Sequence, residues 1–189
     1  MLHRVPLVGL VLLALPAAAP RQGGEDPFAG IPGVTYTYYD VTGDTPAAIR
    51  KDMNTKRFVD PSDQKPVDSL SRWRYGWRMQ RGADGQCDPS SVTVTFAAEV
   101  KLPRLTGLDT LPRPVAARWQ RYYAALLRHE AGHVAYAWSR HDALLAALKA
   151  SSCETMKAVG TAELDKIRAH DRAYDGETRH GASQGAVFP

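Results

Sequence analysis

Polar and apolar residues alternate along residues 72–79, which is the period of a half-buried β-strand. Every second residue there is aromatic or Met, and these residues are Trp73, Tyr75, Trp77 and Met79. Residues 91–100 (SVTVTFAAEV) are rich in β-branched side chains, which also indicates a strand. Residues 82–89 contain turn-forming residues between the two segments. The pattern therefore predicts an antiparallel hairpin or meander.

One more strand and several helices follow from the same kind of pattern. Residues 34–41 (VTYTYYDV) are β-branched and aromatic and predict a strand. Thr45 followed by Pro46 has the features of a helix N-cap, with a short helix to about residue 54. Apolar residues recur with helical spacing from 115 to about 150, which predicts one long helix or two with a bend. A further helix is expected over residues 153–170.

The remaining segments are expected to be loops or connections, because they are rich in Pro, Gly and polar residues. They are residues 21–33, 55–69, 101–114 and the tail from 171 to 189. Strands come first along the chain and helices follow, which favours the α+β class. The fold expected for residues 21–189 is a single domain with a small antiparallel β-sheet packed on the long helix, plus a further helix.

The first twenty residues have the features of a signal peptide. A short basic start precedes an apolar run over residues 5–15, and three alanines at 17–19 offer a cleavage region. The apolar run is too short to span a bilayer, so we expect residues 1–20 to be removed. The mature protein would then lie in the periplasm or outside the cell, with no stable membrane insertion.

Export changes the expectation for the two cysteines, Cys87 and Cys153. In an oxidising compartment an even pair usually forms a disulfide, and two buried thiols are the alternative. The formal net charge of the 189-residue chain is +4, and its basic residues are scattered rather than clustered. That distribution favours a solvated surface over a nucleic-acid groove, so no nucleic-acid partner is expected.

The sequence His129-Glu130-Ala131-Gly132-His133 lies inside the long predicted helix. Histidines four residues apart are neighbours on one helical face, so their rings can converge on a single metal ion. A glutamate beside the first histidine can reach a water molecule at that ion and act as the general base. Zinc suits imidazole ligands and has no redox chemistry, so one Zn²⁺ ion is the expected cofactor.

An exposed helical face that binds nothing is the structural alternative for this motif. Gly132 argues against it, because a glycine inside a helix costs about 1 kcal/mol relative to alanine. Its presence indicates that another group approaches the helix closely at this point.

A third zinc ligand is expected from the C-terminal part of the chain, since catalytic zinc usually has three protein ligands. His180 is the first choice, because glycines on both sides of it let the backbone turn over the helix. Asp175 is the second choice and His170 the third, and Glu163 and Glu154 are weaker possibilities. A solvated tail histidine is the alternative for His180.

These motifs resemble a bacterial family described as predicted secreted zinc-dependent proteases, known as domain of unknown function 922. The resemblance covers nearly the whole mature chain except residues 55–69. The matching residues are Tyr39-Asp40-Val41-Thr42-Gly43, Trp73, Trp77, Cys87, Trp119, the His129–His133 motif, Cys153, Tyr174-Asp175, Thr178-Arg179-His180-Gly181 and Gln184-Gly185. The resemblance implies export, zinc, a zincin-like fold and a peptidase activity.

A zinc-dependent metallopeptidase acting on a peptide or protein substrate is the functional hypothesis that follows. Tyr174 and Arg179 could stabilise the oxyanion of its transition state, although a plain structural role is an alternative for both. By analogy with such proteases, a peptide could add to the edge of the sheet as an extra strand. The competing hypotheses are a non-catalytic envelope-associated module that retains a metal site, and a metalloamidase acting on cell-wall crosslinks.

Overall fold

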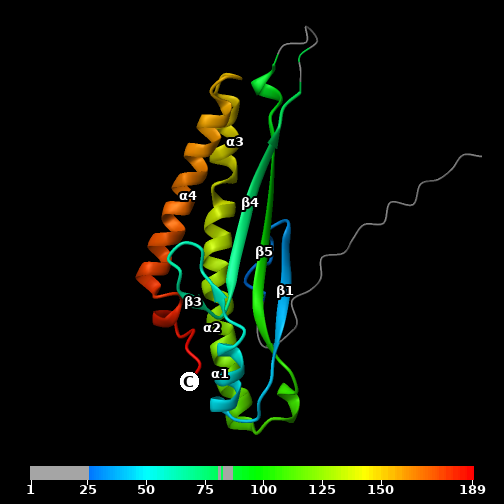
Figure 1. The fold of residues 1–189 in the computed structure, drawn as a ribbon. Helices are drawn as coiled ribbons and strands as arrows, with labels where there is room; N and C mark the ends of the chain where they lie inside the picture. The colour runs from blue at the N-terminus through cyan, green and yellow to red at the C-terminus, as the bar shows by residue number, and fades with distance from the viewer. Residues whose placement is uncertain (1–25, 81, 83–86) are drawn as a thin grey trace, which may run out of the picture.

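The computed structural model describes residues 26–80, 82 and 87–189, and Figure 1 shows an elongated molecule in which a narrow sheet runs along a set of helices. Two helices rise along the sheet and a third returns beside them. The elements in chain order are β1 (Val34–Val41), α1 (Pro46–Asn54), β2 (Phe58–Val59), β3 (Pro66–Val67), β4 (Leu70–Arg78), β5 (Thr93–Leu105), α2 (Arg113–Ser139), α3 (His141–Lys149) and α4 (Met156–Thr178), with 3-10 turns at Pro89–Ser91, Leu108–Thr110 and Ala182–Gln184. The α+β class is confirmed.

The main sheet has the strand order β1-β5-β4. β4 pairs antiparallel with β5, as the alternating pattern predicts, and Trp73 lies opposite Ala98. The expectation of a purely antiparallel sheet is wrong, however, because β1 runs parallel to β5 with Val34 opposite Ala98. A parallel pair requires a long crossover connection, and the chain from α1 to β4 provides it. β4 is left at one edge of the sheet.

The connection predicted over residues 101–114 is wrong for its first part, because β5 continues to Leu105. Pro103 lies inside this strand and pairs with Tyr39 of β1. The pairing with β4 already ends where Leu70 lies opposite Lys101. On that side β5 is locally an edge strand, where a residue without a backbone N–H is tolerated.

The helical predictions hold, apart from the end of the last helix. The side chain of Thr45 accepts a hydrogen bond from the backbone N–H of Ala48 and caps α1 as predicted. The long predicted helix is interrupted at Arg140, which divides it into α2 and α3. The prediction of an irregular tail from residue 171 is wrong up to Thr178, because α4 continues to that residue. Gly176 makes this segment a poor helix by propensity alone, and contacts with α2 offset that cost.

The segment predicted as a loop over residues 55–69 contains the two-residue strands β2 and β3, which pair with each other. The buried carboxylate of Asp68 holds it to the rest of the molecule. Arg50 and Arg57 form ion pairs with Asp68 at 3.0 and 2.8 Å, and the Tyr122 hydroxyl donates to it at 2.8 Å. These charged contacts fix the segment against α1 and α2.

Two hydrophobic cores lie one after the other along the molecule. The first core lies where β1, β5 and α1 meet most of α2, and its members include Val41, Ile49, Met53, Val100, Leu102, Trp119, Tyr122, Leu126, Val134 and Phe188. The second core lies where α3 and α4 meet the end of α2, and it contains Val92, Ala137, Leu144, Leu148, Met156, Leu164 and Ile167. Trp73 and Phe96 of the sheet pack against both cores.

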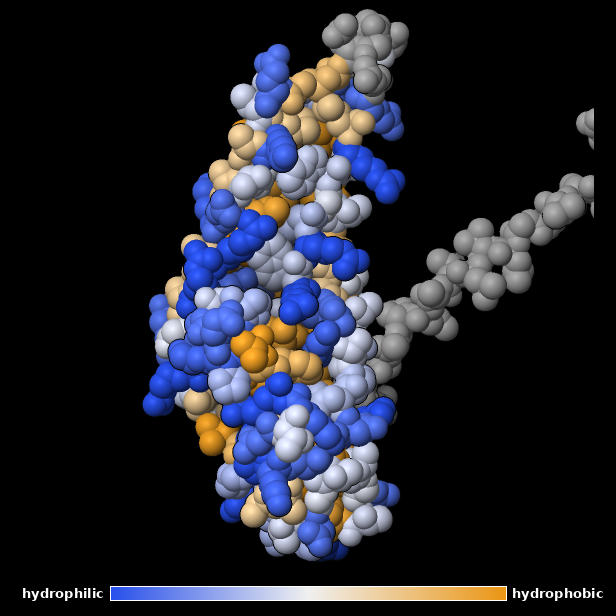
Figure 2. All heavy atoms as spheres, viewed as in Figure 1, coloured by the Kyte–Doolittle hydropathy of each residue, from blue (hydrophilic) through white to orange (hydrophobic). Residues whose placement is uncertain are grey.

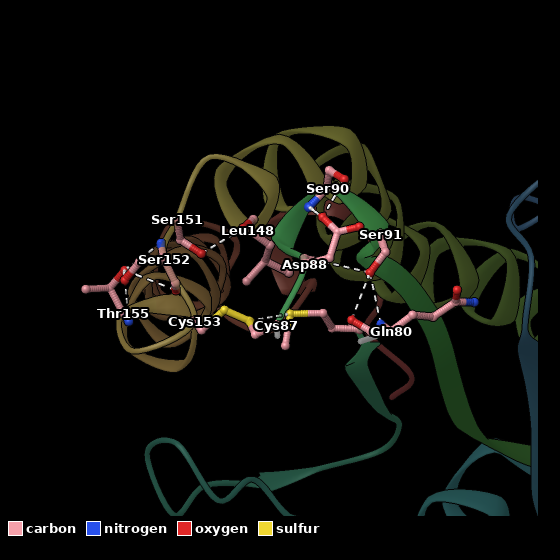
Figure 3. Close-up of a disulfide and its surroundings, with 11 residues drawn as sticks. Gln80, Cys87, Asp88, Ser90, Ser91, Leu148, Ser151, Ser152, Cys153 and Thr155 are labelled. Carbon is pink, nitrogen blue, oxygen red and sulfur yellow. Dashed lines mark hydrogen bonds between the residues drawn. A yellow bond between two sulfur atoms is a disulfide. The ribbon is translucent and has the colours of Figure 1, made fainter. Parts of the chain in front are cut away.

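The predicted disulfide between Cys87 and Cys153 is confirmed, with a Cα–Cα distance of 6.2 Å. It joins the segment before β5 to the turn between α3 and α4, at the end of the molecule that carries the second core (Figure 3). Of the helices described, none is both long enough and apolar enough to cross a membrane. The expected signal peptide, residues 1–20, lies outside the described part of the chain.

Candidate metal centre

α2 presents His129 and His133 on one buried face, where their exposed fractions are only 3% and 8%. α4 runs beside them and contributes Asp175. The Nε2 atoms of His129 and His133 lie 3.3 and 3.1 Å from Oδ1 of Asp175. One ligand atom from each of the three residues lies within 4.8 Å of the other two, a spacing suited to one metal ion. The two imidazoles predicted from the helical spacing therefore do converge.

A hydrogen-bond acceptor lies behind each imidazole. The Nδ1–H of His129 donates to Oε1 of Gln184 at 3.1 Å, and the Nδ1–H of His133 donates to Oδ1 of Asp171 at 3.0 Å. The indole N–H of Trp73 in turn donates to the other oxygen of Asp171 at 2.7 Å. Such partners fix the ring orientation of a ligating histidine, so that its Nε2 atom faces the place where a metal would bind.

The electrostatics of these residues also suit a bound cation. Burial alone would lower the pKa of His133, but the hydrogen bonds that its ring donates to Asp171 and Asp175 outweigh burial and raise the pKa to about 10. Burial would raise the pKa of Asp175, yet its hydrogen bonds with His129 and His133 hold that pKa well below its usual range. The pocket between the helices thus stabilises positive charge beside Asp175, and its two imidazoles and one carboxylate are a donor set that fits zinc.

The carboxylate of Glu130 is buried on the sheet side of α2, at 3% exposure. The Ser69 hydroxyl, just before β4, donates to Oε1, and the Ser71 hydroxyl within β4 donates to Oε2 at 2.6 Å. Each carboxylate oxygen has two lone pairs, so one hydrogen bond on each leaves Glu130 able to accept a proton. The serines orient the carboxylate without closing it off.

Gly132 lies where the ring of Tyr174 packs against α2. A Cβ atom at Gly132 would lie 2.6 Å from Cζ of Tyr174, so only glycine fits there. Tyr174 stacks on His129 with ring centroids 5.1 Å apart, and its hydroxyl accepts a hydrogen bond from the Gln184 side chain at 2.9 Å. The close approach that the helical glycine predicts is therefore confirmed.

His180, the first choice for the third ligand, falls in a different group from His129 and His133. Its Nδ1 lies 3.4 Å from Oδ1 of Asp175 and its Nε2 lies 2.9 Å from Oδ2 of Asp63. The structure thus places Asp175, the second choice, directly against the two helix histidines, with His180 on a further side of the same carboxylate. His170 stacks on Tyr136 and belongs to neither ligand group found among the described residues.

A cleft of about 770 Å³ extends from α1 and the β2–β3 segment to α4, and its lining includes His129, Glu130, His133, Asp175 and His180. Figure 2 shows apolar atoms gathered in the middle of this face within a ring of hydrophilic side chains. Arginines contribute much of the charge in the cleft lining, and they are Arg50, Arg57, Arg72, Arg168, Arg172 and Arg179. Arg179 is exposed in this lining, whereas Tyr174 lies flat against His129.

Sequence reasoning missed Ser69, Ser71 and Asp171 and left Gln184 without a role. Asp171 carried a usable signal, because it precedes Asp175 by one helical turn and both fall on one face of α4. Ser69 and Ser71 carried none, since nothing in a strand sequence shows which distant carboxylate it will meet.

The chain belongs to a bacterial protein family of unknown function, DUF922, whose family model matches residues 36–181. The match spans both the helix motif and the His180 segment. No curated protein matches the chain, and no solved structure matches it.

Proposed function

We propose that the protein is an exported zinc-dependent metallopeptidase of zincin-like design, with Glu130 as its general base. One observation carries the proposal. Two imidazole nitrogens and a carboxylate oxygen converge within 4.8 Å in a cleft, and a buried, oriented glutamate lies between the two histidines on the same helix. Metallopeptidases that carry this helix motif use the same division of labour between ligands and base.

His129 and His133 would hold the ion, with Asp175 as the third ligand. Zinc bound there supplies Lewis acidity towards a substrate carbonyl and towards a water molecule. Glu130 accepts the proton of the attacking water as its oxygen bonds to the carbonyl carbon. When the carbon–nitrogen bond breaks, Glu130 delivers that proton to the leaving amine. Ser69 and Ser71 keep the carboxylate aimed during both transfers.

The position of β4 supports a peptide as substrate. β4 is an edge strand, and its first residues, Leu70, Ser71 and Arg72, line the cleft together with Glu130. An extended peptide can add to such an edge through main-chain hydrogen bonds, which would lay its backbone along the cleft. The disulfide is compatible with a protein that works outside the cytoplasm.

The test compares the wild-type protein with Glu130→Gln, using unstructured peptides as substrate and measuring zinc content in parallel. We expect Glu130→Gln to retain zinc and lose roughly 100-fold or more of the turnover, because proton transfer contributes about 10²- to 10⁴-fold. Glu154→Gln is the matched control, since Glu154 is exposed near the disulfide, and it should keep full activity.

The competing functions give different results in the same assay. A metal-retaining binding module would show no turnover in either protein. A metalloamidase would cleave crosslinked cell-wall peptides, again through Glu130, while leaving linear peptides intact. Activity that survives Glu130→Gln would contradict the proposed role of this residue.

A further inference from the structure

The cleft contains a second group of metal-ligating atoms, from Asp60, Asp175 and His180, which also lie within 4.8 Å of one another. This group shares Asp175 with the first. We propose that it forms a second divalent-cation site, so that the Asp175 carboxylate bridges two ions. The inference rests on the first metal centre of the proposed function and extends it to a two-metal hydrolase.

The hydrogen bonds of His180 select the nitrogen that faces the proposed site. Its Nε2–H donates to Oδ2 of Asp63 at 2.9 Å, which leaves the lone pair of Nδ1 free. That Nδ1 lies 3.4 Å from Oδ1 of Asp175 and 3.8 Å from Oδ2 of Asp60. His180 is therefore held as His129 and His133 are held, with an acceptor behind one nitrogen and the other nitrogen facing Asp175.

Asp60 supplies the independent observation. Its side chain is only 9% exposed, and Oδ1 already accepts the backbone N–H of Ser62 at 2.7 Å. The only partner of Oδ2 among the described residues is His180 Nδ1 at 3.8 Å, which is too long for a hydrogen bond. This mostly buried carboxylate lines the cleft, and a cation beside it would offset the cost of burying its charge.

The convergence on Asp175 points the same way. Nitrogens of three histidines, His129, His133 and His180, lie 3.1–3.4 Å from the single oxygen Oδ1 of Asp175. One carboxylate oxygen therefore faces the ligand nitrogens of both groups, which is the arrangement that a carboxylate shared by two ions needs. Carboxylates shared by two ions are a feature of hydrolytic two-metal sites, in which the ions lie about 3.5–4 Å apart.

The test measures metal content after the purified mature protein is loaded with Zn²⁺ alone and passed through a desalting column. Wild type should hold about two equivalents, as in other two-metal hydrolases. Asp60→Asn and His180→Ala should each hold one, because the first site stays intact. Asp109→Asn is the matched control, because Asp109 is exposed away from the cleft, and it should keep the wild-type content.

Other outcomes overturn the inference, and they differ from a failure of the proposed function. One equivalent in wild type and in Asp60→Asn, with none in His180→Ala, would make His180 a ligand of a single ion. One equivalent in all proteins would leave Asp175 as the third ligand of a single site. His133→Ala tests the first site separately, and a metal content that this change leaves intact would count against the proposed peptidase centre. Circular dichroism of each variant identifies a loss that comes from unfolding.

Discussion

The first and second cores of this protein are stabilised in different ways. The first core contains buried aromatic residues, among them Trp119 and Tyr122, and the C-terminal Phe188 packs against both of these rings. The second core is smaller and mostly aliphatic, and the Cys87–Cys153 disulfide lies at its end of the molecule. A small core buries less apolar surface, and a covalent link compensates for that.

The proposed metal centre lies where the two cores meet. α2 leaves the first core at Val134, just after His133, and enters the second at Ala137. α4 leaves the second core after Ile167, one turn before Asp171. On α2 the polar residues of the site are interspersed with the last residues of the first core, whereas on α4 they lie just beyond the second core. The comparison teaches that the site depends on the alignment of two separately packed regions.

The largest expected effect on stability comes from removing the disulfide beside the second core. Replacing both Cys87 and Cys153 by serine should lower the free energy of unfolding by about 2–4 kcal/mol, because the bridge closes a loop with a sequence separation of 66 residues. Urea unfolding measures this loss. The folded variant should still bind zinc, since the first core holds α2. A parallel loss of zinc from the folded protein would mean that the disulfide aligns the site directly.

Trp73→Phe tests the contact that joins sheet, α4 and metal centre. The ring still packs against both cores, but the N–H that donates to Asp171 is gone. Asp171 orients His133, so we expect zinc affinity to fall by about 10- to 100-fold. Competition with a fluorescent chelator measures the change. Trp77→Phe, in the second core, is the control, and an equal loss there would point to general loosening.

Alanine substitutions at three helical glycines compare packing at the site, in the second core and on the exposed surface. Gly132→Ala should cost about 1–2 kcal/mol, because its Cβ would meet Tyr174 and overpacking outweighs the gain in helix propensity. Gly160→Ala should also destabilise, since its Cβ would lie 2.7 Å from the Trp77 ring. Gly176→Ala meets no atom within 4 Å and should stabilise by up to about 1 kcal/mol. Thermal unfolding measures the stability of each variant. A Gly132→Ala protein as stable as Gly176→Ala would contradict this packing.

The smallest expected effect concerns the charged rim of the cleft. Arg172 is exposed there and has no ion-pair partner among the described residues. Arg172→Gln should reduce kcat/KM for acidic peptides only a few-fold, because an exposed charge contributes about 1 kcal/mol or less. Neutral peptides should be unaffected. Arg78→Gln, at the far end of β4, is the control, and equal effects of the two changes would exclude a local role for the rim.

The parts of the site that could be predicted are those within one helical turn. Helical geometry predicts that His129, Glu130 and His133 lie close together. A glycine at position 132 predicts close packing there, because glycine has a low helix propensity. The choice between Asp175 and His180 depended on whether the chain was helical at residues 171–178. The glycines at 176, 181 and 185 favoured an irregular tail from residue 171, but packing of Tyr174 against α2 accompanies a helix that continues to Thr178.

The unpredicted parts join residues far apart in sequence. Ser69 meets Glu130 across 61 positions, and His180 meets Asp63 across 117. The direction of β1 relative to β5 was also not predictable, because the sequence of β1 fits a parallel or an antiparallel neighbour equally well. Pro103 misled the prediction of β5, since its tolerance depends on where β4 ends. Such facts follow from topology, which residue patterns do not specify.

The parallel pairing of β1 with β5 also affects the point in folding at which the cleft is formed. β4, β5 and α2 are neighbours in sequence and can associate early, whereas β1 must wait for its distant partner. The cleft needs residues 60–71, α2 and the end of α4 together, so it is completed among the last contacts. We therefore expect a newly made chain to acquire the proposed cation, and with it the proposed hydrolytic activity, only after nearly all of the polypeptide has folded.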